Sequence, residues 1–242
     1  MSEQAATSGG KEPAVLVLGI GNLLWADEGF GVRAVEEMHR RYEVPDNVTL
    51  MDGGTQGIYL VQHVRDADVL IVFDAVDYGL PPGTMKLVED EEVPRFMGCK
   101  KISLHQTGFQ EVLAMAAMMG DAPRRLLLIG VQPEELEDYG GSLRAVVKAQ
   151  IGPAIEKAVE ELSRLGISLR RRPVPLPPES TIACPIMHSE RYEGERPSAA
   201  EACRVGDPRL LADANFAPPA DPEAEIEAIL GRIPEGPSGG RG

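Results

Sequence analysis

Hydrophobic residues recur along the first two thirds of the chain in two alternating patterns. Continuous apolar runs, typical of strands buried on both faces of a parallel sheet, lie between segments in which apolar residues are spaced by three or four, as on one face of a helix. In the segment 28–42, for example, Val32, Val35, Met38 and Tyr42 share one helical face. We therefore expect strands at 14–19, 48–51, 68–73, 84–88 and 125–130, and helices at 28–42, 56–64, 109–119 and 142–165.

The alternation of strands with helices predicts an α/β fold, a doubly wound and mostly parallel sheet with helices on both faces. Pro153 lies inside the last helical segment and has no backbone donor, so we expect a kink or break near Gly152. Sheets of this kind carry their functional sites at the carboxyl ends of the strands.

Proline usage divides the chain in two. Residues 1–167 hold 8 of the 20 prolines, and residues 168–242 hold the other 12. Proline-rich segments favour extended, irregular backbone. We predict a disordered leader at 1–12, an α/β domain at 13–167, and a Pro-rich extension at 168–242 with short helices and partial disorder. This extension either packs short helices on the domain or adds a docking surface for a partner.

Acidic residues follow three of the predicted strands. Glu28 comes after the first strand and its glycine-containing turn, Asp52 opens the segment DGGT after the second, and Asp74 directly follows the third. A fourth segment, Ser103–Gln106, contains His105 and precedes a helix. Since strand ends of a parallel sheet face one crevice, Glu28, Asp74 and His105 are candidates to meet there. Two carboxylates and an imidazole suit a borderline divalent ion such as zinc or nickel.

Structural roles for these residues remain open from spacing alone. Asp27 and Glu28 suit the capping of a helix N-terminus, and an aspartate after a strand often shapes a turn. His105 is also typical of a buried, hydrogen-bonded histidine. We expect the other three histidines to be solvated, namely His39, His63 and His188.

The turn Gly19-Ile20-Gly21 raises a further possibility, a nucleotide site, because glycines after a first strand can cradle a pyrophosphate. The third glycine of that pattern is missing, and Asp27 and Glu28 lie where a phosphate would be repelled. Both observations count against a dinucleotide.

Charge and composition narrow the choice of partners and compartment. The chain has 24 Lys and Arg against 38 Asp and Glu, a net charge of −14, which disfavours nucleic acids and anionic membranes. No apolar run approaches the roughly 20 residues of a membrane span, and the N-terminus lacks the apolar core of a signal peptide. We expect a cytoplasmic protein. Its three widely spaced cysteines form neither a disulfide framework nor a zinc knuckle.

Several segments together resemble one family. Residues 14–166 contain VLVLGIGNLLWADEGFGVRAVE, MDGGTQG, VLIVFDAVDYGLPPGTMKL, KISLHQTG and LIGVQPEELE, in this order. They resemble the maturation endopeptidases of [NiFe]-hydrogenases. The segment RYEGERPSAAEACR at 191–204 is similar to the longer members that serve membrane-bound uptake hydrogenases.

The resemblance implies an endopeptidase that removes the C-terminal peptide of the hydrogenase large-subunit precursor after nickel insertion. The precursor supplies the nickel, which Glu28, Asp74 and His105 would contact, and zinc or cadmium is expected to substitute. Asp52 is a further motif acid in the same crevice. No G-x-S-x-G or H-E-x-x-H motif is present, so we expect an aspartic or metal-dependent peptidase in which water attacks, with Asp52 or Asp74 as general base. We expect a monomer. The alternatives are a checkpoint that binds the nickel-loaded precursor without cutting it and a nucleotide-handling α/β enzyme.

Overall fold

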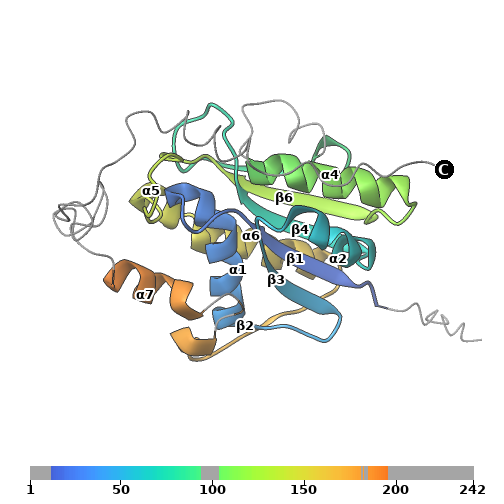
Figure 1. The fold of residues 1–242 in the computed structure, drawn as a ribbon. Helices are drawn as coiled ribbons and strands as arrows, with labels where there is room; N and C mark the ends of the chain where they lie inside the picture. Colours follow the sequence, from blue (N-terminus) through green and yellow to red (C-terminus); the bar gives the residue numbers. More distant parts are fainter. Residues whose placement is uncertain (1–11, 94–103, 181, 183–184, 196–242) are drawn as a thin grey trace, which may run out of the picture. The chain divides into compact units, whose positions relative to one another are not determined.

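The computed structural model describes residues 12–93, 104–180, 182 and 185–195, apart from the side chains of 104–107 and 179 (Figure 1). All of them belong to the first of two units, which ends at Glu195. The predicted leader, except residue 12, and the extension from residue 196 onward lie outside the described residues. None of the helices in the described part of the chain combines the length and apolarity that a bilayer span needs.

A five-stranded sheet forms the centre of this unit, in the order β3–β1–β4–β6–β5. Four strands run parallel, and the edge strand β5 is antiparallel to β6. The bounds are β1 Val15–Ile20, β3 Val48–Gly54, β4 Val69–Ala75, β5 Met85–Glu89 and β6 Arg125–Val131. The predicted doubly wound, mostly parallel sheet is therefore confirmed.

Helices cover both faces of the sheet (Figure 1). Buried side chains of α1 and α6 pack on one face, and those of α2 and α4 pack on the other. We call these the α1 face and the α4 face. Fully burying a single leucine or isoleucine stabilises a fold by about 1.5–3 kcal/mol, so the two apolar layers hold the sheet in place. The helices are η1 Ala26–Gly29, α1 Phe30–Arg41, η2 Gly57–Leu60, α2 Val61–Arg65, α4 Leu104–Met118, α5 Ala145–Lys148 and α6 Ile151–Arg164.

The predicted break in the last helical segment is present. Helix α5 ends at Lys148 and α6 begins at Ile151. Pro153 consequently lies in the first turn of α6, where the backbone N–H groups have no partner inside the helix. The break thus lets the chain keep this proline without losing a hydrogen bond.

The described residues between 170 and 194 run back along α1, and we call them the C-terminal strap. The strap begins with β7 (Arg170–Arg171), which pairs antiparallel with β2 (Tyr42–Glu43). The backbone N–H groups of Arg172 and Leu176 then donate to carbonyl oxygens at the end of α1, at 2.7 and 2.9 Å. Three short helices follow, η3 Pro178–Ser180, η4 Pro185–Met187 and α7 Ser189–Gly194.

The N-terminus of α1 approaches the ends of β1 and β4 so closely that a side chain has no room there. A Cβ atom on Gly31 would overlap the carbonyl oxygens of Phe73 in β4 and Ile20 in β1. Both are backbone atoms and cannot rotate away. The glycine therefore lets the helix begin directly above the strand ends.

Replacing Gly31 with alanine should lower the free energy of unfolding by about 2 kcal/mol or more, because the helix must move off the sheet. Urea unfolding measures this loss. Gly152→Ala is the matched helical control, since its nearest neighbour would be Nη1 of Arg41 at 3.8 Å. Equal stability of the two variants would contradict the close packing.

Candidate functional site

The order of the strands identifies the edge at which a site is expected. From β1 the chain passes through α1 to β3 on one side, and then crosses to β4 on the other side of β1. The strand order thus reverses between β1 and β4. In α/β sheets, ligands bind outside the carboxyl ends of the strands at such a point.

Glu28 is held at this edge by the loop that follows β1. Gly21 has a φ of 136°, which favours glycine, and a Cβ there would overlap the carbonyl oxygen of Glu28. The loop therefore folds back on its own start. Helix η1, which carries Glu28, also packs against β4. Glu28 is half-buried, and η1 holds it beside β4, the strand that carries Asp74.

Asp74 lies near the end of β4 and is fully buried. Its neighbours Phe73 and Ala75 pack into the core on the α1 face, so strand alternation directs Asp74 to the α4 face. The hydroxyl of Tyr78 lies on the same side, against Gly130, which pairs with Asp74 in the sheet. Burial, together with the charge of Asp74, raises the pKa of Tyr78.

His105 lies in the first turn of α4, because the helix begins at Leu104 and not at the predicted residue 109. The glycine at position 108 weakens the helical pattern in the sequence, yet it brings this turn close to Gly57 of η2. Helix α4 covers the face to which Asp74 points. The side chain of His105 lies outside the described part of the structure.

Asp52 approaches the same edge from the other face. It pairs with Gly19, and a Cβ on Gly19 would overlap the backbone of α1, so both positions point to the α1 face. Asp52 therefore does not lie beside Asp74. Burial raises the pKa of Asp52, a hydrogen bond from the Gly54 backbone lowers it, and the nearby charges of Glu36 and Arg33 raise and lower it, respectively.

Asp27 has a role that the sequence analysis did not assign. The N-cap residues of η1 and α1 are Trp25 and Gly29, so Asp27 caps neither helix, although it lies in the first turn of η1. The buried carboxylate instead accepts hydrogen bonds from the backbone N–H groups of Glu134, Glu135 and Arg144, at 2.9, 2.9 and 2.7 Å. These bonds fix the loop after β1, and with it Glu28, to the segment after β6.

Gln132 was also missed by the sequence analysis. It is buried directly after β6, and its Oε1 accepts hydrogen bonds from the N–H groups of Tyr78 and Leu80, at 2.7 and 3.1 Å. Its Nε2 donates to Oδ1 of Asp77 at 3.0 Å. Gln132 thereby braces the loop that follows Asp74. Its position after an apolar strand is the one sequence signal that points to this role.

His188 was predicted to be solvated, and this prediction is wrong. Only 2% of the residue is exposed, because it caps α7 where that helix packs beside α1. Its Nδ1 accepts a hydrogen bond from the N–H group of Glu190 at 3.4 Å. The strap position that buries it is a tertiary feature, invisible in the local sequence.

The side chains of Glu28 and Asp74, two of the three predicted metal ligands, thus lie near this edge. For His105, the third, the structure describes the backbone alone. Among the described side chains, no three from histidine, cysteine, aspartate and glutamate are close enough together to hold a metal ion. The imidazole of His105 is not among these side chains. The three-ligand set therefore stays a prediction.

A doubly wound sheet with acidic residues at its switch point and no nucleotide-binding glycine pattern places the chain among α/β proteins with an acidic site at the strand ends. Comparison with known proteins makes this specific. The family model for hydrogenase maturation proteases (HycI) matches residues 32–161. The chain belongs to the hydrogenase maturation protease family and is a peptidase.

Individual relatives agree with this assignment. The hydrogenase expression/formation protein HupD of Thiocapsa roseopersicina is 64% identical over 200 residues, covering 83% of this chain and 90% of that protein. HoxM of Azotobacter vinelandii is 62% identical over 199 residues, covering 82% and 95%. Among solved structures, the hydrogenase maturating endopeptidase HybD from E. coli has a TM-score of 0.62 and 42% identity, and covers 65% of this chain and 97% of its own.

These lengths show which relatives share the C-terminal strap. A match of 200 residues in a chain of 242 must include residues 43–200 wherever it begins, so it contains the strap. The match to HybD includes 97% of the HybD chain but only 65% of this one. That share is about the length of the α/β domain alone. The strap is therefore a feature shared with HupD and HoxM.

Replacing Asp27 with alanine should lower the free energy of unfolding by about 3 kcal/mol or more, because three backbone donors lose a charged acceptor. Chemical denaturation measures this. The exposed Asp46 is the control, and Asp46→Ala should change little. A loss no larger than that of the control would show that Asp27 does not hold the loops.

Asp52→Asn should make the protein more stable at pH 7. The pKa of Asp52 is raised by folding, so the folded protein binds its proton more tightly, and stability is lost as the pH rises through the folded pKa. Asparagine removes that cost. The advantage should shrink as the pH falls toward the ordinary aspartate pKa of 3.8. Unfolding from pH 4 to 8, with Asp46→Asn in parallel, tests this; an advantage that grows at low pH would contradict it.

Proposed function

We propose that this protein is the endopeptidase that removes the C-terminal peptide from a [NiFe]-hydrogenase large-subunit precursor once nickel has been inserted. The observation that carries the proposal is the arrangement at the switch point. Three features support it: Asp74 is buried near the end of β4, η1 with Glu28 packs against that strand, and α4, whose first turn carries His105, covers the face to which Asp74 points. The uptake type is proposed because the strap is shared with HupD and HoxM.

The nickel is treated as part of the substrate. Carboxylate oxygens of Glu28 and Asp74 and the imidazole of His105 form a mixed donor set that suits nickel and equally zinc or cadmium. A set of three ligands with an open side recognises a metal that another protein already holds. Recognition of this kind would make cleavage depend on nickel loading.

Peptide hydrolysis requires an activated water and a proton for the departing amine. A carboxylate accepts a proton from the water as its oxygen attacks the scissile carbonyl carbon, and the same proton then passes to the nitrogen as the C–N bond breaks. Asp52 and Asp74 are the candidate bases, and they reach the strand ends from opposite faces of the sheet. The raised pKa of Asp52 favours this role, because a base works best with a pKa closer to the working pH. Nickel would polarise the carbonyl or only position the peptide.

The expected setting follows from the same proposal. The precursor is the partner, and we propose that the enzyme acts in the cytoplasm as a monomer, without nucleic acid or membrane. Its net charge of −14 is consistent with both exclusions.

His105→Ala should lower the rate at which the nickel-loaded precursor is shortened by a factor of about 100 or more, while the fold is kept. Mass spectrometry of precursor incubated with enzyme measures the loss of the C-terminal peptide. His63→Ala is the control, since His63 is exposed on α2. Normal processing by His105→Ala would refute the site. An unaltered mass with the wild-type enzyme would favour the checkpoint alternative.

A further inference from the structure

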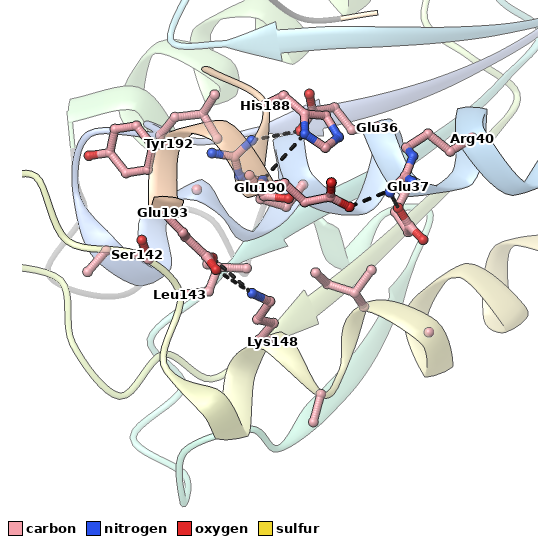
Figure 2. Close-up of a pocket in the computed structure, with 18 of the residues that line it drawn as sticks. Glu36, Glu37, Arg40, Ser142, Leu143, Lys148, His188, Glu190, Tyr192 and Glu193 are labelled. Atoms are coloured by element: carbon pink, nitrogen blue, oxygen red, sulfur yellow. Dashed lines mark hydrogen bonds and ion pairs between the residues drawn. The ribbon is translucent and has the colours of Figure 1, made fainter. Parts of the chain in front are cut away.

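A cavity of about 490 Å³ lies between α1, the segment 142–152 and helix α7 of the C-terminal strap (Figure 2). Its size is within the range of small-ligand and peptide pockets. Its lining combines apolar side chains with eight charged ones from α1, α5 and α7, the larger apolar ones being Leu23, Leu143 and Ile151. No part of the proposed catalytic chemistry has used this space.

The cavity and the proposed site share the loop after β1. Leu23, Ala26 and Gly29 line the cavity, and all three belong to the loop after β1 that carries Glu28. One side of this loop therefore presents Glu28 near β4, while the other side forms a wall of the cavity. Contacts made in the cavity therefore act directly on the loop that carries Glu28.

The charges around the cavity are already paired with one another. Nη1 of Arg33 donates to Oε2 of Glu36 at 2.9 Å, and Nζ of Lys148 donates to Glu193 at 2.8 Å, as Figure 2 shows for the latter. The remaining lining cations are paired as well, Arg40 with Glu37 and Glu190, and Arg41 with Glu37. No surplus charge is left for a phosphate or a metal ion. A lining of apolar side chains and mutually paired charges fits a peptide segment that carries no net charge.

Helix α7 forms one wall of the cavity. Side chains of the α/β domain hold it in this position. Besides the ion pair of Lys148, Nη1 of Arg33 donates to the carbonyl oxygen of Met187 at 2.6 Å, and its guanidinium lies 5.9 Å from the ring centroid of Tyr192. Arg33 and Glu36 are buried beneath this wall. The wall belongs to the strap. HupD and HoxM match this chain over a length that includes the strap, whereas the match to HybD is about as long as the α/β domain alone.

We propose that this cavity is a recognition subsite for the precursor, which takes an extended, largely uncharged peptide segment flanking the cleaved bond. The proposal rests on the proposed endopeptidase function and adds where the strap-bearing enzymes hold their substrate. Binding of the peptide in the cavity aligns it with the loop that carries Glu28. The free energy of this binding stabilises the complex of enzyme and precursor.

Filling the cavity tests the proposal. A side chain on Gly152 enters it from α6, where only Nη1 of Arg41 lies nearby, at 3.8 Å. Gly152→Phe should raise KM for the nickel-loaded precursor about tenfold and change kcat little, since uniform binding is lost. The affinity for nickel salt alone should be unchanged. Gly194→Phe is the matched control, because Gly194 is exposed at the end of α7 and does not line the cavity. It should leave KM unaltered.

A charge exchange tests the wall itself. Lys148→Glu and Glu193→Lys should each raise KM, because α7 is repelled from α5, and the double variant should restore it. A merely structural role for the pair would change unfolding without a rise in KM and its rescue.

An unchanged KM in a folded Gly152→Phe protein would overturn the subsite, as would equal effects of Gly152→Phe and Gly194→Phe. If the wild-type enzyme does not shorten the precursor at all, the proposed function fails, and the cavity is then judged by calorimetry with intact precursor. Weaker binding by Gly152→Phe alone supports the subsite, and equal binding by all three proteins refutes it.

Discussion

The close packing of α1 on the ends of β1 and β4 is the constraint on which the rest of the site depends. Because residue Gly31 has no side chain, the start of α1 lies directly on the backbone of both strands. The loop between β1 and α1 must therefore turn back within a short distance, which Gly21 permits through its positive φ. Glu28 is consequently presented beside β4. Without this approach the acidic residues of the two strand ends would be separated by the thickness of a side-chain layer.

Two aspartates, Asp27 in η1 and Asp52 in β3, show how burial has opposite effects. Asp27 is buried and accepts hydrogen bonds from three backbone donors, so its charge holds two loops together. Asp52 is partly buried with one backbone donor, and burial raises its pKa. The first arrangement stabilises the fold. The second destabilises the ionised carboxylate, a cost typical of groups that take part in chemistry.

The C-terminal strap extends the same framework. It adds no strand to the main sheet and instead follows α1, where backbone hydrogen bonds and the side chain of Arg33 hold it. Its last helix then encloses a cavity whose opposite wall is the loop of Glu28. The strap thus adds a wall beside α1 and leaves the strand ends unaltered.

The sequence by itself determined the elements with strong apolar patterns and the edge at which they place their acids. All five strands, the parallel sheet and the break before Pro153 follow from periodicity and backbone chemistry, which are local properties. The start of α4 was misplaced because glycine and polar residues weaken its first turns. Only the tertiary structure decided which face each carboxylate joins, since Asp52 and Asp74 follow similar strands and point to opposite sides of the sheet. It also decided that Asp27 binds distant backbone and that His188 is buried. These outcomes depend on contacts between residues far apart in the chain, and no local pattern encodes them.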